Sequence, residues 1–374
     1  MVKPRPKPAS GSNALQAAFA RQAIRYKELG SPFNQLVCDL FASQVMPHGP
    51  VSAMLNSWPH DPNGQDTVGS QGNAHELLPL QMTAALHGLV LDNKSSTLTQ
   101  LYPTNNPDHA YQLPTADNLW SAISEALREH KLYFLSRLQL TQQTSDAGQA
   151  AIVLCGVLQA VMLTGKHTVR LSELQASAGL NLLPDYYSIH LADSTHGPPD
   201  SPVKLTPDWS GNPPPTPAYK IIGRAGSDPS PLAAKNKEHR TRLLSYFCPD
   251  QHHRLATCRA AMRIAASVDP GLQTADPVTW LAARLAQPLG DAVHLVFFTD
   301  AGRRLDAITQ KQCLDVIETA ARRATEQSPL AWFRLEPDSE NPEGSSIFLT
   351  VWPAGKSHLI GRTNPQGDWI HWNL

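Results

Sequence analysis

One apolar run constrains the fold of this chain more than any other feature. Residues 151–163 read AIVLCGVLQAVML, which puts apolar side chains on all sides of a helix, and Gly165 follows as a stop signal. The run is shorter than the roughly 18 residues that a membrane span needs. A helix without a polar face has to be shielded from water on every side. The run therefore predicts a helix buried in the middle of the protein.

The residues before Gly165 have the pattern of helices and almost none of the pattern of strands. The first helix can be capped by Ser12 or Asn13 and ends at Gly30. Segments rich in Pro, Gly, Asn and Asp separate it from further helices, which we expect at residues 32–45, 75–91 and 116–138. We therefore predict a helical N-terminal domain, residues 1–165, that contains no sheet.

After Gly165 the pattern changes to strands that alternate with helices. We expect strands at residues 167–174, 218–228, 292–300, 330–338, 345–352 and 358–364, and helices at residues 232–247, 250–267, 277–287 and 305–325. This alternation predicts βαβ units and a mainly parallel sheet, and the short PAGK turn makes the last two strands an antiparallel edge hairpin. The fold class is therefore α/β, with a Rossmann-like domain at residues 166–374.

Two segments of the second domain interrupt this alternation. Residues 184–217 are rich in proline and are predicted as neither helix nor strand. Long loops of this kind usually cover or build a site. The end of the chain, DWIHWNL at residues 368–374, predicts an edge strand that packs its tryptophans.

Composition limits the classes of partner. Lys and Arg number 31 and Asp and Glu number 32, so the formal net charge is -1 and no global basic field attracts nucleic acid or an anionic membrane. Five scattered cysteines argue against a disulfide framework and favour a reducing compartment. We expect a cytoplasmic protein with a small-molecule substrate. Because the first acidic residue is Glu28, an amphipathic transit peptide is the one alternative for targeting.

The turn after the first predicted strand is a candidate cofactor site. It reads ELQASAGLNL, residues 173–182, and lies where open α/β sheets bind ligands, at the carboxyl ends of strands. Its small residues let a ligand approach the backbone, and Glu173 can accept hydrogen bonds from a cofactor. Asp228 ends the next strand, where a carboxylate can hold a pair of ribose hydroxyls. The structural alternative is a tight strand-to-helix turn with a capping acid.

The same turn has a second chemical interpretation. QASAG differs by one residue from the G-x-S-x-G elbow of hydrolases, so Ser177 could be a nucleophile with Asp300 as orienter and His358 or His371 as base. Against this, a hydrolase elbow follows earlier strands, and the first 165 residues here are predicted to be helical.

A metal site is the third possibility for this half of the chain. Two cysteines and two histidines lie between residues 248 and 258, but their spacing matches no common zinc site, and the segment has the pattern of an amphipathic helix. We expect no bound metal.

Several longer motifs together resemble one family. They are ELQASAGLNL, the G-x-D-x-x-P-L pattern at residues 226–232, LTQQTSDAGQ at 140–149, SPLAWFRLEPD at 328–338 and GRTNPQGDWIHW at 361–372. On these motifs the chain is similar to the DUF2332 family of uncharacterised, predominantly bacterial proteins. The resemblance covers most of the chain. It implies a helical N-terminal part followed by a Rossmann domain like that of class I methyltransferases.

The resemblance also implies a cofactor, S-adenosylmethionine, and residues that hold it. These are Glu173, Ser177, Gly179 and Asn181 in the first motif, Asp228 at the second acidic position and Asp276 beside the adenine. In this interpretation Asp300 or Glu336 is the base that takes a substrate proton.

This chain departs from the family pattern at several positions. Gln175 stands where the family usually has glycine, and QTSDAGQ at residues 143–149 replaces a segment close to QTNEVGR. Asn364 and Gln366 stand in a terminal motif that often has two histidines. The main expectation is an S-adenosylmethionine-dependent methyltransferase. These departures favour the alternative, a non-catalytic Rossmann-like binding or scaffold protein.

Overall fold

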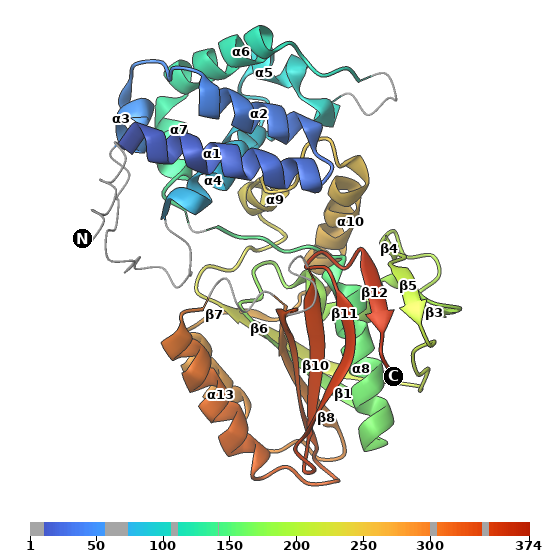
Figure 1. Cartoon of the computed structure of the whole chain (residues 1–374). Helices are drawn as coiled ribbons and strands as arrows, with labels where there is room; N and C mark the ends of the chain where they lie inside the picture. The colour runs from blue at the N-terminus through green and yellow to red at the C-terminus, as the bar shows by residue number, and fades with distance from the viewer. Residues whose placement is uncertain (1–10, 57–73, 106–110, 141, 300–304, 339–343) are drawn as a thin grey trace, which may run out of the picture. The chain divides into compact units, whose positions relative to one another are not determined.

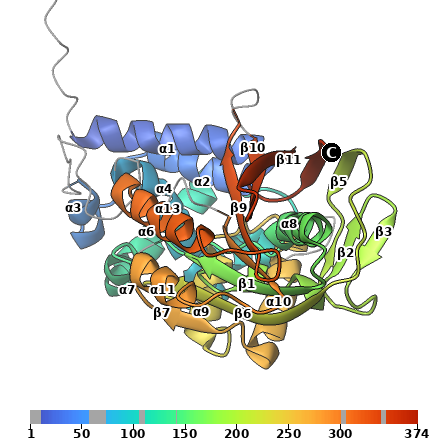
Figure 2. The same ribbon diagram turned by 90° about the horizontal axis from the view of Figure 1, so that it is seen from below.

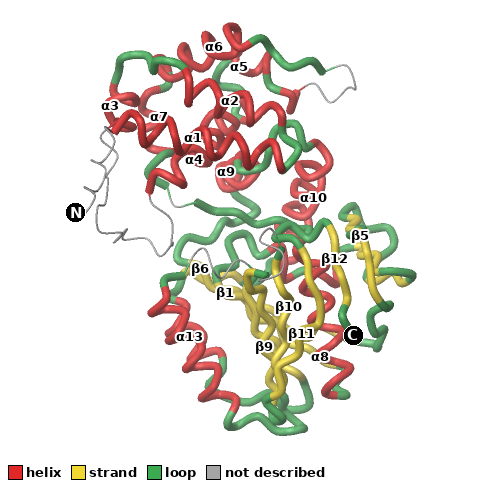
Figure 3. The backbone as a smooth tube through the Cα atoms, viewed as in Figure 1, coloured by secondary structure: helices red, strands yellow, loops and turns green. Residues whose placement is uncertain are grey.

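The computed structural model describes residues 11–374 apart from 57–73, 106–110, 141, 300–304 and 339–343. The described chain forms two compact units (Figure 1). The first contains residues up to 143 together with 241–256, and the second contains most of the remainder, 144–240 and 257–374. Figure 3 shows helices in the first unit and the strands in the second. The helical N-terminal region that the sequence predicts is thus confirmed.

The first unit is built from helices around an apolar core. They are α1 (Gly11–Glu28), α2 (Pro32–Ser43), α3 (Pro50–Asn56), α4 (Ala74–Leu91), α5 (Ser96–Leu101), α6 (Ala116–Glu129) and α7 (Lys131–Arg137), with a 3-10 turn, η1 (Pro103–Asn105). The expected helix at 116–138 is divided at His130, which lies between α6 and α7. Phe19 and Phe41 stack in the core with ring centroids 4.7 Å apart. Burial of these rings together with many aliphatic side chains stabilises the unit.

The segment 241–256 is bonded to this unit through a partly buried acid, Asp250. Asp250 accepts hydrogen bonds from the Ser31 hydroxyl at 2.6 Å and from the backbone N–H of Phe33 at 2.9 Å. Ser31 is also the N-cap of α2. One carboxylate therefore satisfies donors at a helix start, where backbone N–H groups have no partner within the helix.

The second unit is organised around a nine-stranded sheet among the residues described. Its order is β5-β12-β11-β10-β9-β8-β1-β6-β7. The strands are β1 (Thr168–Leu174), β5 (Asp208–Gly211), β6 (Lys220–Asp228), β7 (Leu272–Thr274), β8 (Val293–Phe298), β9 (Leu330–Pro337), β10 (Ser345–Trp352), β11 (Lys356–Thr363) and β12 (Trp369–Trp372). The strands from β7 through β6, β1 and β8 to β9 are parallel, and β10, β11 and β12 continue the sheet antiparallel. This confirms a mainly parallel sheet with an antiparallel hairpin.

Two details of the sheet differ from the sequence prediction. The β10–β11 hairpin does not lie at the edge, because β12 follows it and β5 pairs in parallel with β12. The proline-rich segment is not free of regular structure, since it contributes β5 and a small sheet of β2 (Ser188–Leu191), β3 (Ser194–His196) and β4 (Lys204–Leu205). Strands of two to four residues are too short for an alternating pattern to stand out between prolines.

The buried helix that the apolar run predicts is α8 (Gln149–Thr164). Every residue from Ala150 to Val161 is buried, and Gly165 ends the helix with a positive φ of 66°. A Cβ atom at Gly156 would lie 2.4 Å from the ring of Phe333 on β9, so this glycine lets the helix approach the sheet closely. The prediction of a buried helix is confirmed as far as Val161, while Met162 and Leu163 at the end of the apolar run are exposed.

Helices cover both faces of the sheet in the second unit. Figure 2 shows α8 on one side and α11 (Pro277–Arg284) and α13 (Ala307–Ala321) on the other. Two more helices, α9 (Lys237–Ser245) and α10 (His252–Val268), connect β6 to β7. Among the helices that the structure describes, none combines the length and the apolar character that crossing a lipid bilayer requires.

Candidate functional site

The strand order identifies one end of the sheet as the place for a ligand. From β1 the chain adds β6 and then β7 on one side, and later adds β8 and β9 on the other side of β1. The direction of strand addition therefore reverses between β1 and β8. Open parallel sheets bind ligands outside the carboxyl ends of their strands at such a reversal.

A buried polar cluster lies at this reversal. Asn181, in the 3-10 turn η2 (Leu180–Leu182), donates from Nδ2 to Glu173 Oε1 at 3.3 Å, to Thr299 Oγ1 at 3.3 Å and to Gln149 Oε1 at 3.0 Å. Thr299 in turn donates to Gln149 Oε1 at 2.8 Å. These four residues, here called the switch-point cluster, bring the ends of β1 and β8 together with the start of α8. Glu173 is only 2% exposed.

Asp228 lies beside the cluster but has a different environment. It is fully buried, and its Oδ2 accepts the backbone N–H of Ser177 at 3.0 Å while its Oδ1 accepts that of Ser230 at 2.8 Å. The backbone N–H of Leu232 donates to the carbonyl of Ser177 at 2.9 Å. Asp228 therefore fixes the turn after β1 to the turn after β6.

That turn has an unusual backbone. Gln175 has a φ of 56° and Ser177 a φ of 50°, both in the left-handed region that non-glycine residues seldom adopt. Gly179 has a φ of 67°, and a Cβ atom there would lie 2.9 Å from side-chain atoms of Pro270 and Leu272. The bonds to Asp228 hold Ser177 in this conformation, and tight packing accounts for Gly179.

Three buried side-chain oxygens at these turns have no hydrogen-bond partner within the described residues: Ser177 Oγ, Asn181 Oδ1 and Ser227 Oγ. Leaving such a group without a partner costs about 1–3 kcal/mol. Asn181 Oδ1 is the most informative of them, because its amide nitrogen already serves three acceptors of the cluster. A ligand group with a hydrogen to donate could satisfy this oxygen.

The other predicted site residues have separate surroundings. Asp276 is exposed and caps α11, accepting the backbone N–H of Thr279 at 2.9 Å. Glu336 on β9 forms an ion pair with Arg334, with Arg334 Nε and Glu336 Oε1 2.5 Å apart. Asp300 lies outside the described residues. No hydrogen bond or ion pair among the described residues joins Asp276 or Glu336 to the switch-point cluster.

The histidines of the hydrolase interpretation do not reach Ser177 in the described structure. His371 Nδ1 lies 2.9 Å from the hydroxyl of Ser210, and His358 lies on β11, far along the sheet from β1. A buried serine–histidine contact is present elsewhere, between Ser172 and His294. Within the described chain, no group of three or more His, Cys, Asp or Glu side chains could hold a metal ion.

Gln149 is the residue of the cluster that sequence reasoning did not assign to the site. It ends the segment 143–149, one of the motifs singled out for the family resemblance. Its Nε2 donates to the carbonyl of Pro365 at 2.8 Å, and Gly148 and Gly367 allow the two turns to approach each other closely. Two motifs that are more than two hundred residues apart therefore meet at the switch point.

The comparisons with known proteins give a family without an activity. The family described as "Uncharacterized protein conserved in bacteria (DUF2332)" matches residues 16–372, nearly the whole chain. No curated protein and no solved structure matches the chain. The chain therefore belongs to the DUF2332 family.

Proposed function

We propose that this protein is a cytoplasmic S-adenosylmethionine-dependent methyltransferase with a small-molecule substrate, and that the cofactor binds at the switch point. One observation carries the proposal: a carboxylate and an amide with an unpartnered oxygen, Glu173 and Asn181, lie together at the reversal between β1 and β8. Rossmann-type sheets place polar cofactor contacts at this position.

The residues at the switch point fit such a cofactor in part. Asn181 Oδ1 and the Glu173 carboxylate can accept hydrogens from the ammonium or hydroxyl groups of the cofactor, and the Ser177 hydroxyl can donate or accept. Asp228 does not fit the role of ribose acceptor, because both of its oxygens already accept backbone N–H groups. The proposal therefore assigns the contact with cofactor hydroxyls to Glu173.

The chemistry requires little of the protein beyond positioning. When bound, S-adenosylmethionine would supply a methyl group to a nucleophile of the substrate, and the carbon–sulfur bond would break with its electron pair left on the sulfur, which becomes a neutral thioether. The cluster would orient the cofactor and, being buried, keep water away from it. Glu336 and Asp300 remain the predicted bases, and Glu336 would have to exchange its contact with Arg334 for one with the substrate.

A non-catalytic scaffold is the second candidate, and a specific observation favours it. The acid expected to hold ribose, Asp228, instead fixes the turn of Ser177, as a purely structural acid would. In this interpretation the strained turn and its buried hydroxyls are features of packing alone.

Calorimetric titration separates the two candidates. We expect wild-type protein to bind S-adenosylmethionine, and Glu173→Gln to weaken binding by about tenfold, since a hydrogen bond to a charged group is worth about 1.5–3 kcal/mol. Glu318→Gln, an exposed change of the same kind on α13, is the matched control and should bind like wild type. Wild-type protein that gives no binding heat at millimolar cofactor would leave the scaffold as the function.

A further inference from the structure

A second set of polar side chains lies at the amino-terminal half of β1, away from the switch-point cluster. Arg170 and Ser172 lie two residues apart on one face of β1, and Arg170 is the register partner of His294 on β8. Arg284, the last residue of α11, donates from Nε to the Ser172 hydroxyl at 3.0 Å. That hydroxyl lies 2.8 Å from His294 Nε2. We call these four residues the basic site.

The basic site gathers cationic groups without a carboxylate. His294 is 4% exposed, and burial together with the charges of Arg284 and Arg170 lowers its pKa to about 3, so the ring is neutral. Burial lowers the pKa of Arg284 as well, and the charge of Arg170 adds to the effect. Neither Arg170 nor Arg284 forms an ion pair with another described residue.

Most of the hydrogen-bond donors of the two guanidinium groups are also unused. Within the described residues, the bond from Arg284 Nε to Ser172 is the one hydrogen bond that either side chain makes. A guanidinium carries five N–H donors in a rigid fork. The two half-buried guanidinium groups carry like charge and lie close enough that the charge of Arg170 lowers the pKa of Arg284, so they repel one another unless an anion lies between them.

We propose that Arg170 and Arg284 form a binding site for an oxyanion of the phosphate class. A phosphate group has the charge and the oxygen geometry that paired guanidinium groups recognise through two-pronged hydrogen bonds. It would remove the repulsion between the arginines and satisfy their free donors. This site is separate from the switch-point cluster and does not depend on the proposed methyl transfer.

The surroundings of the arginines support this role. Both side chains are half-buried, so solvent can reach them. Gly223 on β6 is the register partner of Arg170, and even a Cβ atom there would lie no closer than 3.7 Å to Arg170 Nε. Because Gly223 has no side chain, the side chain of Arg170 can lie across this position. Ser172 and His294 position Arg284, because the hydroxyl that accepts from Arg284 Nε can donate in turn to the neutral imidazole.

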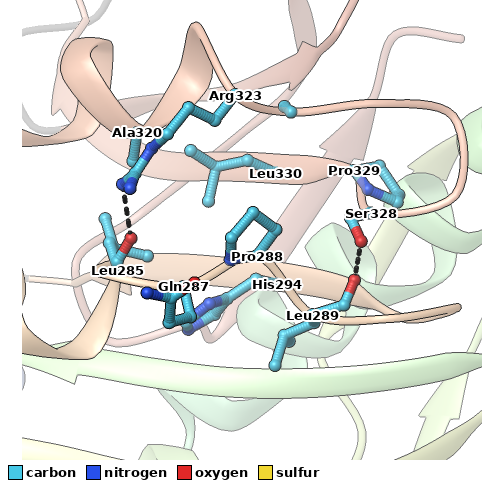
Figure 4. A pocket seen from close by; sticks show the side chains of 11 residues that line it. Leu285, Gln287, Pro288, Leu289, His294, Ala320, Arg323, Ser328, Pro329 and Leu330 are labelled. Atoms are coloured by element: carbon cyan, nitrogen blue, oxygen red, sulfur yellow. Dashed lines mark hydrogen bonds between the residues drawn. The ribbon is translucent and has the colours of Figure 1, made fainter.

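A small cavity lined in part by His294 is not the site itself. It has a volume of about 30 Å³ and is lined by residues including His294, Gln287 and Arg323 (Figure 4). That volume suits about one water molecule and is too small for phosphate. Arg323 donates to the carbonyls of Leu285 and Ala286, so its guanidinium is already engaged.

Titration with inorganic phosphate tests the proposal. The full chain, in a zwitterionic buffer with sodium chloride at constant ionic strength, is titrated by calorimetry. We expect wild type to bind phosphate and Arg170→Gln and Arg284→Gln each to weaken binding about tenfold or more. Arg263→Gln removes one exposed arginine charge on α10 and is the matched control, expected to bind like wild type. Far-UV circular dichroism establishes that each variant is folded.

Two further measurements keep the test decisive. If an arginine variant does not fold, NMR of the wild-type protein replaces it. We expect the Nε–H resonance of Arg284 to shift on addition of phosphate. Titration with adenosine monophosphate distinguishes free phosphate from the phosphate of a larger ligand: tighter binding than inorganic phosphate identifies a phosphomonoester, and equal binding identifies the free ion. No binding by wild type at millimolar phosphate, or equal weakening by Arg263→Gln, would overturn the proposal.

Discussion

The charged side chains at the two ends of β1 differ in how many hydrogen-bond partners the protein gives them. At the carboxyl end, Glu173 accepts the side-chain amide of Asn181, and the neighbouring Asp228 accepts two backbone N–H groups. In the amino-terminal half, Arg284 donates one hydrogen bond, to Ser172, and the side chain of Arg170 makes none among the residues described. The acids therefore accept hydrogen bonds from the protein, while the two arginines keep unused donors and have no ion pair with any described residue.

This difference separates groups that hold the fold from groups that can bind a ligand. A buried charge with good internal partners contributes to folding, and removing it leaves those partners unsatisfied. A half-buried charge with few internal partners contributes little to stability and is available to a ligand of opposite sign. On this criterion Asp228 is a structural residue, and Arg170 and Arg284 are binding residues.

The largest expected effect comes from removing the structural acid. Asp228→Ala leaves the backbone N–H groups of Ser177 and Ser230 without their acceptor in a fully buried place. We expect the free energy of unfolding to fall by about 3 kcal/mol, measured by urea denaturation without any ligand. Asp276→Ala is the control: it removes an exposed helix cap on α11 and should cost about 1 kcal/mol. An equal cost for both variants would contradict the structural role of Asp228.

A smaller effect is expected from pH at the basic site. The pKa of His294 is lowered to about 3 by burial and by Arg284 and Arg170, against about 6.5 in the unfolded chain. Between these two values the unfolded state binds a proton that the folded state does not, so stability falls as the pH drops through this window. From pH 7 to pH 5 the loss should be about 2 kcal/mol.

Comparison of two variants isolates this contribution from that of other titrating groups. His294→Asn, which can still accept from Ser172, should show a shallower dependence of the unfolding free energy on pH between 5 and 7 than wild type. His371→Asn, an exposed change on β12, should keep the wild-type dependence. Urea denaturation at both pH values, in buffers without phosphate, gives the comparison. A wild-type slope in His294→Asn would mean that the pKa of His294 is not lowered in the folded protein.

The sequence was sufficient for the architecture but not for the roles of individual acids. The run at 151–163 predicted α8 correctly, because a helix with no polar face leaves no choice about burial. The β6 end at Asp228 was also placed correctly, at the carboxyl edge. The two amides that its carboxylate accepts come from turns 51 and 2 residues away, and no local pattern indicates which of several nearby donors a carboxylate will choose.

The cluster was only partly visible for the same reason. Glu173 and Asn181 lie in one motif, and Thr299 ends a predicted strand, so sequence order alone places them near the switch point. Gln149 reaches it through the packing of α8 against the sheet, which tertiary contact decides. The sequence did not predict the basic site, because Arg170 and Arg284 are separated by more than a hundred residues and neither belongs to a motif.

The smallest expected effect comes from one hydroxyl of the switch-point cluster. Thr299→Val keeps the shape of the side chain and removes the bond to Gln149 Oε1 and the acceptor at 3.3 Å from Asn181. Gln149 and Asn181 still bond to each other at 3.0 Å, so the cluster should survive, with a loss of about 1 kcal/mol in urea denaturation. This variant also tests whether the two ends of β1 are independent. Because the basic site is separate from the switch-point cluster, Thr299→Val should leave phosphate binding at the basic site unchanged. A loss of 3 kcal/mol or more would show instead that the cluster depends on every bond, as the turn at Asp228 does.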